Sequence, residues 1–175
     1  QTVNPVKETQ ETEMPDTTVT ISYLALGDSY TIGESVSTSK RWPVQLRDSL
    51  LNSGFDTVNV EIIARTGWTT GELLSAIESG NSEGPYELVS LLIGVNNQFR
   101  NYEFSIYEQE FEVLLKKAIT FAGNDTSRVI VLSIPDYGVT PFGQNQNPEK
   151  IAREIDRYNQ YAHTVCETYN VAYFD

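Results

Sequence analysis

The sequence has very little cysteine and histidine, with one residue of each, Cys166 and His163, in a chain of 175 residues. A single cysteine cannot form a disulfide within the chain, and one cysteine with one histidine cannot supply the clustered ligands of a zinc site. No apolar run approaches the roughly 18 residues that a membrane-spanning helix needs. We therefore expect no internal disulfide, no metal and no other cofactor.

Basic residues are also scarce. Lys and Arg together number 12, whereas Asp and Glu number 24, which gives a formal net charge of -12. Such an acidic surface repels the phosphate backbone of nucleic acids, so we expect no nucleic-acid partner. The hydrophobic share of 39% and the charged share of 21% are ordinary for a globular chain. The length suits one domain with one sizeable core.

Residues 1–17 are polar, acidic and rich in threonine, with two prolines and almost nothing to bury. We expect a flexible tether there, ahead of a domain that spans 18–175. The chain does not begin with Met and shows neither the basic nor the apolar part of a signal peptide. A tether of this kind often follows a removed export signal or a lipid-anchored cysteine, which favours an exported protein (periplasmic, extracellular or lipid-anchored). A ragged end of a cytoplasmic protein is the alternative.

Five short apolar runs alternate with helical patterns. The runs are rich in β-branched and aromatic residues and are mostly continuous, which is typical of strands buried on both faces of a parallel sheet. They lie at 19–27, 58–65, 86–95, 128–136 and 170–175. The spacing of apolar residues between the runs predicts helices over 41–54, 69–80, 105–123 and 148–170.

The alternation of strand and helix, with no internal repeat, predicts an α/β domain built as a three-layer α/β/α sandwich. Right-handed crossovers favour a flavodoxin-like, five-stranded parallel sheet in the order 2-1-3-4-5. The helix at 41–54 places Trp42, Leu46 and Leu50 on one face, and Thr70 is the expected N-cap of the helix that follows the second strand. Ligands of such sheets bind at the carboxyl ends of the strands, so the residues after each strand are the candidates for a site.

Three residues that follow strands supply the parts of an acyl-transfer site. Ser29 offers a hydroxyl nucleophile, Gly67 has no side chain to shield its N–H, and Asn96 offers a side-chain amide. Taken singly, each is an ordinary turn or loop residue. Because they follow strands that are neighbours in the predicted order, they can converge. Asp28, beside Ser29, is interpreted as a turn-forming or capping carboxylate, since neighbours on an extended backbone point opposite ways.

The sequence resembles the SGNH or GDSL-type esterases and lipases in three blocks. The stretch GDSY at 27–30 looks like their first block, and the glycine of ARTGWTT, Gly67, looks like their second. GVNN looks like their third block, usually written Gly-x-Asn-Asp, with Asn96 as its first asparagine. Asn97 departs from the usual Asp, and it keeps a similar hydrogen-bonding shape without the charge.

The resemblance covers about 18–175 and implies a serine ester hydrolase that needs no cofactor. Its partner would be a small-molecule acyl ester of a lipid or a carbohydrate. In this family Ser29 would be the nucleophile, and the N–H groups of Ser29 and Gly67 and the side chain of Asn96 would hold the oxyanion.

A serine nucleophile needs a general base, and the resemblance implies one in a fourth block, Asp-x-x-His, after the fifth strand and before a last helix. Residues 18–175 lack this block. His163 falls in mid-helix, with Gln160 three residues before it, and we interpret it as a surface histidine. One hypothesis is an esterase whose base lies beyond Asp175, downstream or on a separate C-terminal fragment, so that the chain alone is inactive. The other is a non-catalytic carbohydrate- or cell-wall-binding module on the same fold.

Aromatic residues near the strand ends are candidates for substrate contact, although ordinary packing competes as an interpretation. The candidates are Trp68, Tyr137 and Phe142, followed by Trp42, Phe99 and Tyr102. The polar segment 136–148 is long, and we expect it to shape specificity. A phosphate or flavin site in the stretch GDSYTIGES is a more distant alternative, which a yellow cofactor would reveal.

Overall fold

The structure is a computed structural model that describes residues 18–175, and the tether expected at 1–17 lies outside the described residues. The strands are β1 (Thr20–Gly27), β2 (Thr57–Ala64), β3 (Leu88–Leu92), β4 (Val129–Leu132) and β5 (Ala172–Phe174). The helices are α1 (Ser29–Ile32), α2 (Trp42–Asn52), α3 (Thr70–Ser79), α4 (Val95–Phe99), α5 (Phe104–Phe121), α6 (Pro141–Gln144) and α7 (Pro148–Tyr169). Three short 3-10 turns are η1 (Thr38–Lys40), η2 (Thr126–Arg128) and η3 (Tyr137–Val139). Within 18–175, no helix is both long enough and apolar enough to span a bilayer.

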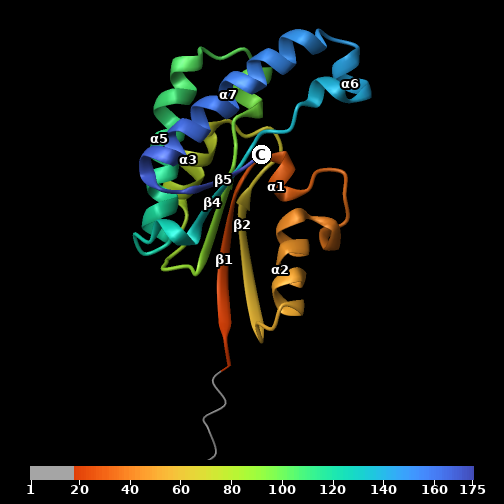
Figure 1. The fold of residues 1–175 in the computed structure, drawn as a ribbon. Coiled ribbons are helices and arrows are strands. Elements are labelled where there is room, and N and C mark those ends of the chain that lie inside the picture. The colour runs from red at the N-terminus through yellow and green to blue at the C-terminus, as the bar shows by residue number, and fades with distance from the viewer. Residues whose placement is uncertain (1–17) are drawn as a thin grey trace, which may run out of the picture.

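The five strands form one parallel sheet in the order β2-β1-β3-β4-β5. Helices α3, α5 and α7 lie on one side of the sheet, whereas α2 and the short α1 lie on the other (Figure 1). The predicted three-layer sandwich and the predicted strand order are therefore confirmed. Because parallel strands run the same way, the segments that follow β1, β2 and β3 emerge at one edge of the sheet.

Two cores hold β1 from both sides. The main core lies between the sheet and α3, α5 and α7, and its fully buried side chains include Tyr107 and Phe111. The smaller core joins Tyr23 and Val58 to one face of α2. That face carries the predicted stripe of Trp42, Leu46 and Leu50. The last five residues of β1 are buried as a result, so the strand that leads to Ser29 is firmly anchored.

The sheet face that α2 shares is less well covered over β4 and β5. Val129 and Val131 of β4 point into the main core, so Ile130 and Leu132, which alternate with them, face the other side. Both are half-buried, and Leu132 pairs with Phe174 of β5, whose side chain is 56% exposed. We call Ile130, Leu132 and Phe174 the β4–β5 strip.

The ends of some elements and the exposure of the edge strands differ from the predictions. Strand β3 ends at Leu92, earlier than predicted, because Gly94 turns the chain with a φ of 127° and α4 follows. The N-cap of α3 is Thr69 and not Thr70: the Thr69 hydroxyl accepts the Glu72 N–H at 3.4 Å, while the Glu72 carboxylate accepts the Thr69 N–H at 2.8 Å. Strands β2 and β5, at the two edges, are partly exposed rather than buried on both faces.

Candidate active site

Ser29 opens helix α1 directly after β1. The turn is tight, because a Cβ on Gly27 would lie 2.5 Å from the last carbonyl oxygen of β3 and closer still to the Thr31 side chain. Asp28 caps the helix, and its Oδ1 accepts the Tyr30 N–H at 3.0 Å, which confirms the predicted capping role. As the first residue of α1, Ser29 has no acceptor inside the helix for its own N–H. The structure thus places Ser29 at a helix start rather than in the loop expected from the sequence.

Asp28 is fully buried, and its Oδ2 has no hydrogen-bond partner among the described residues. Burial raises the pKa of Asp28 to about 7, although the hydrogen bond from the Tyr30 N–H acts in the opposite direction. The carboxyl group is therefore neutral for part of the time near pH 7. This limits the negative charge beside Ser29.

Gly67 lies in a tight turn between β2 and α3. The Trp68 N–H donates to the Arg65 carbonyl at 3.2 Å and closes the turn. Gly67 has a φ of 86°, which favours glycine at the third position of such a turn. The Thr66 hydroxyl donates to the Glu34 carboxylate, so the turn contacts the segment that follows α1. The N–H of Gly67 is not the one that closes the turn.

Asn96 lies on α4, a helix of five residues, where the sequence analysis expected a loop. One N–H of its side-chain amide donates to the Trp68 carbonyl at 2.8 Å, which joins α4 to the turn that contains Gly67. Because a side-chain amide carries two N–H groups, this bond orients Asn96 and leaves a second donor. Ser29, Gly67 and Asn96 are all half-buried.

Ser29 and Asn96 line the same hollow, which has a volume of about 240 Å³. The hollow is also lined by Tyr30, Val95, Phe99, Tyr137 and Phe142. The rings of Phe99, Tyr137 and Phe142 lie 6.0 to 6.3 Å apart between centroids, and we call these three residues the ring cluster. Two aromatic candidates named first from the sequence, Tyr137 and Phe142, therefore lie next to Ser29.

The candidates Trp68, Trp42 and Tyr102 do not line this hollow. Trp68 packs against the main core and is not among the residues that line this hollow. Trp42 lines a second hollow of about 230 Å³, which Ser29 also borders. Tyr102 borders neither of the two. The structure therefore brings Trp42, but not Trp68 or Tyr102, to a hollow that Ser29 lines.

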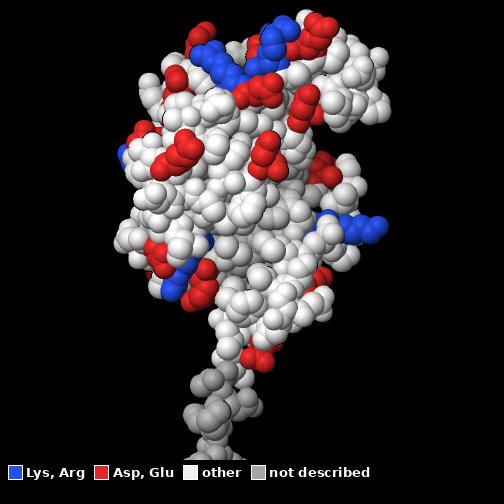
Figure 2. All heavy atoms as spheres, in the orientation of Figure 1, with Lys and Arg blue, Asp and Glu red and all other residues white. Residues whose placement is uncertain are grey.

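Much of the segment 136–148, predicted as a long polar loop, folds into η3 and α6. The Tyr137 hydroxyl donates to the Gln98 side chain at 2.8 Å, and the Gln98 amide donates to Glu154 at 2.8 Å. These bonds hold the ring cluster against α4 and α7. No residue of 137–148 is charged, and the projecting α6 segment carries neither charge colour in Figure 2. The sequence carried no signal for Gln98, since its role depends on α4.

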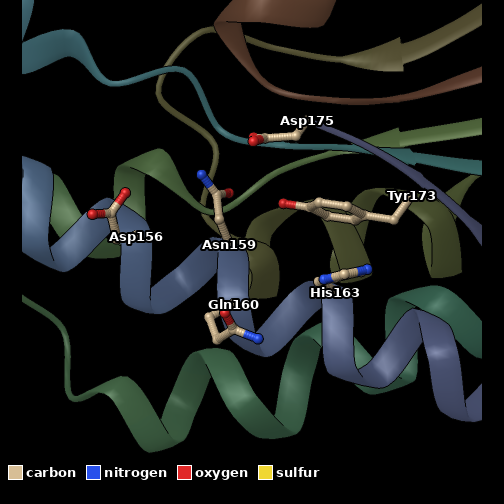
Figure 3. A pocket seen from close by; sticks show the side chains of 6 residues that line it. All are labelled: Asp156, Asn159, Gln160, His163, Tyr173 and Asp175. Carbon is tan, nitrogen blue, oxygen red and sulfur yellow. The ribbon is translucent and has the colours of Figure 1, made fainter.

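His163 borders a different hollow, of about 560 Å³. Figure 3 shows it with the other lining residues, Asp156, Asn159, Gln160, Tyr173 and Asp175. The His163 ring stacks on Tyr173 with centroids 4.9 Å apart, and its Nε2 lies 3.8 Å from the Glu167 carboxylate. The side chain is 47% exposed, as predicted for a surface histidine. Ser29 is not among the residues of this hollow.

Other sources of chemistry are limited in the described residues. No group of three His, Cys, Asp or Glu side chains within 18–175 is placed to bind a metal ion. Cys166 is buried and free, and burial raises its pKa to about 12. Its thiol therefore stays protonated and is a poor nucleophile.

A comparison with known proteins finds a relative of similar sequence. An arylesterase from Vibrio mimicus is 30% identical over 118 residues, which are 66% of this chain and 56% of that protein. The chain thus spans little more than half the length of this curated relative.

Solved structures share the fold. TesA matches with a TM-score of 0.67 and 21% identity, over 87% of this chain and 76% of that chain. AlinE4, an SGNH-hydrolase family esterase, matches with a TM-score of 0.65 and 19% identity, over 88% and 75% of the two chains. A variant of Axe2, an acetyl xylan esterase from Geobacillus stearothermophilus, matches with a TM-score of 0.65 and 19% identity, over 89% of this chain and 76% of that chain.

The sequence itself matches a family model over nearly all of the described domain. Residues 25–175 match the model of the GDSL-like Lipase/Acylhydrolase family. The match includes the segments that carry Ser29, Gly67 and Asn96. The chain therefore belongs to the GDSL-like lipase/acylhydrolase family, the SGNH hydrolases.

Proposed function

We propose that this chain carries the nucleophile and the oxyanion hole of a serine ester hydrolase that cleaves small acyl esters. Ser29 Oγ attacks the ester carbonyl carbon, and the carbonyl oxygen takes the negative charge of the tetrahedral intermediate. Collapse of that intermediate expels the alcohol and leaves an acyl group on Ser29, which water then releases as the acid. The observation that carries this proposal is the hollow that Ser29 and Asn96 share.

The proposed oxyanion hole consists of the N–H groups of Ser29 and Gly67 and the second side-chain N–H of Asn96. Three features support it. The Ser29 N–H has no acceptor within α1, the turn at Gly67 closes through another N–H, and the Trp68 carbonyl fixes the Asn96 amide. Donors fixed in advance favour the charged transition state, and loss of one costs about 3 kcal/mol in a comparable site.

The general base is proposed to lie in an Asp-x-x-His block beyond Asp175. A serine hydroxyl needs a base within hydrogen-bonding reach, and no histidine lines the hollow around Ser29. The half-exposed β4–β5 strip supports the proposal, because a further helix packed on it would bury apolar surface at about 25 cal/mol per Å². We accordingly expect a polypeptide that ends at Asp175 to have little or no turnover.

The proposed substrates are small uncharged esters. The ring cluster offers an apolar surface beside Ser29, since Phe99 is 46% exposed and Phe142 is 58% exposed. The neighbouring segment 137–148 has no charge that would bind an ionic substrate. One relative is described as an arylesterase and another as an acetyl xylan esterase, and both descriptions name ester substrates.

The test uses the protein with its native downstream residues and p-nitrophenyl acetate as substrate. Ser29→Ala should abolish turnover, whereas Ser39→Ala, at an exposed serine, should leave it unchanged. Asn96→Ala should lower kcat by about a hundredfold to a thousandfold with a smaller change in KM, because the donor acts mainly on the transition state. Circular dichroism and the melting temperature show that each variant folds.

Two results would overturn parts of this proposal. Turnover that survives in Ser29→Ala would exclude Ser29 as the nucleophile, and a change confined to KM in Asn96→Ala would make Asn96 a substrate-positioning residue. If the complete protein has neither an Asp-x-x-His block nor esterase activity, the binding-module hypothesis replaces the esterase.

A further inference from the structure

Arg100 lies one helical turn after Asn96 and joins α4 to the turn of Gly67. Its Nη2 donates to the Gly67 carbonyl at 2.5 Å. Its Nη1 lies 3.3 Å from the Glu72 carboxylate on α3. One guanidinium therefore holds both the turn and the start of the helix that follows it.

The contact matters because of where it falls in the turn. Gly67 has a φ of 86°, a region that glycine enters freely and can also leave freely. The hydrogen bond to the Gly67 carbonyl restrains the peptide plane between Gly67 and Trp68. It thereby limits the backbone rotation at Gly67 that would turn this plane relative to the residue's own N–H. The next carbonyl, that of Trp68, accepts from Asn96 at 2.8 Å. Two successive carbonyls of the turn are thus bound by Asn96, on α4, and by Arg100, the C-cap residue of that helix four positions later.

Arg100 is itself held on its far side. The Glu72 carboxylate accepts the Thr69 N–H at 2.8 Å within the capping box of α3. The hydrogen bond from the Thr69 N–H is the main cause that lowers the pKa of Glu72, and the Thr69 hydroxyl and the nearby charge of Arg100 lower it further. The carboxylate is thereby fixed and charged near neutral pH, so it holds the guanidinium in one direction while the Gly67 carbonyl holds it in another. A planar group with five donors suits two such acceptors, whereas a lysine ammonium does not.

We propose that Arg100 is a positioning residue that sets the placement of the Gly67 N–H relative to the Asn96 side chain, and so the geometry of the oxyanion hole. This inference rests on the proposed esterase function. Arg100 touches neither the nucleophile nor the reacting atoms in this scheme. It acts through the turn that it binds.

The test compares Arg100→Ala, Arg100→Lys and Arg47→Ala in the protein with its native downstream residues. Arg47 is a matched control, because it is exposed to a similar extent and, among residues 18–175, its side chain pairs only with its neighbour Asp48. Arg100→Ala should lower kcat about tenfold with KM changed less than twofold, since a misplaced donor weakens transition-state binding. Arg100→Lys should recover part of the loss, and millimolar guanidinium added to Arg100→Ala should restore activity. Arg47→Ala should match the wild type.

An amide NMR spectrum separates this inference from the esterase proposal, because it needs no turnover. In Arg100→Ala the resonances of the Gly67 amide and of the Asn96 side chain should shift, while those of β4 and α7 should not. If the shifts appear in a protein without esterase activity, the positioning role stands and the esterase proposal fails. Unshifted Gly67 and Asn96 resonances would overturn the positioning role, as would an unchanged kcat in an active enzyme or a loss that guanidinium does not restore.

Discussion

Thr70 and Asn97 are joined by two hydrogen bonds of opposite direction. The Thr70 N–H donates to Asn97 Oδ1 at 3.0 Å, and Asn97 Nδ2 donates to the Thr70 hydroxyl oxygen at 2.6 Å. The Thr70 hydroxyl in turn donates a hydrogen bond to the Glu110 carboxylate. Both Thr70 and Asn97 are fully buried. The chain of donors thus uses both the oxygen and the nitrogen of the amide at position 97, where SGNH enzymes usually have Asp.

The variant Asn97→Asp should destabilise the protein at neutral pH. A carboxylate at this position accepts from the Thr70 N–H but cannot donate to the Thr70 hydroxyl, and it competes with Glu110 for the hydroxyl proton. The cost should be about 1–3 kcal/mol of unfolding free energy, as for a buried polar pair that loses its match. Burial raises the pKa of an acid in the folded state, so the deficit should shrink as the pH falls and the new carboxyl gains a proton that it can donate.

Urea denaturation at neutral and at mildly acidic pH measures this effect. The control is Asn52→Asp, at the exposed end of α2, which should cost little at either pH. A deficit of Asn97→Asp that stays the same or grows on acidification would contradict the proposed donor chain.

Gly27→Ala should mainly lower the stability of the protein, whereas Gly67→Ala should mainly lower its activity. A Cβ at position 27 meets backbone of β3 at 2.5 Å, so Gly27→Ala should lose about 2–3 kcal/mol of unfolding free energy through overpacking. At position 67 the nearest atom is a nitrogen of Arg100, at 3.5 Å, and only the φ of 86° is unfavourable. Gly67→Ala should therefore lose only about 1–2 kcal/mol of unfolding free energy. Its main effect should be a lower kcat, because the Gly67 N–H belongs to the proposed oxyanion hole.

Thermal unfolding and steady-state kinetics on the same preparations check this contrast. Equal losses of stability in the two variants would show that the turn at Gly67 is as tightly packed as the one at Gly27. Full activity in Gly67→Ala would remove Gly67 from the oxyanion hole.

The sheet was predictable because its signal is spread over whole segments. Each strand is a run of apolar residues that layers on both sides of the sheet can bury, and right-handed crossovers favour the order 2-1-3-4-5. The strand ends then bring Ser29 and Asn96 to one edge without any knowledge of side-chain detail. The edge strands β2 and β5 were the exceptions, since their exposure depends on what lies beside them.

The parts that could not be predicted are short and depend on tertiary contacts. Helices α1, α4 and α6 have four or five residues, too few for a periodic pattern or for stability on their own. The role of Arg100 follows from its place at the C-cap of α4, so it could not be predicted without that helix. At the start of α3 two adjacent threonines offered the same cap, and only the side chain of Thr69 reaches the Glu72 N–H.

Asp28 should make stability fall as the pH rises. Its folded-state pKa, about 7, lies above its ordinary value of 3.8 because of burial. Between these two values the folded protein keeps a proton that the unfolded chain has lost, so this group lowers the unfolding free energy by up to about 1.4 kcal/mol for each pH unit. The contribution of the neutral acid is fully present below the lower value and is lost as the pH rises toward 7.

Asp28→Asn should remove this slope, because an amide keeps an acceptor for the Tyr30 N–H and has no charge to bury. The unfolding free energy of the variant, relative to that of the wild type, should rise by roughly 2 kcal/mol or more between about pH 5 and about pH 8. Asp156→Asn, at an exposed site on α7, is the control and should run parallel to the wild type. Parallel curves for Asp28→Asn would show that Asp28 is charged in the folded protein.

His163→Ala should leave esterase activity nearly unchanged in the protein with its native downstream residues. His163 stacks on Tyr173, lies near Glu167 and borders a hollow that does not include Ser29, so it has no path to the Ser29 hydroxyl proton. We expect kcat/KM within about twofold of the wild type and a stability change within about 0.5 kcal/mol, as for an exposed side chain. Replacement of the histidine in the proposed downstream Asp-x-x-His block should instead abolish turnover.

The pH profile of kcat/KM decides which histidine is the base. Activity should fall as the pH drops through about 6 to 7, because a protonated histidine cannot accept the proton of Ser29. His163→Ala should leave the midpoint of that fall where it is in the wild type, since the proposed base is a different histidine, beyond Asp175. A tenfold loss of kcat in a folded His163→Ala variant, or a displaced midpoint, would assign the base to His163 and remove the need for a downstream block.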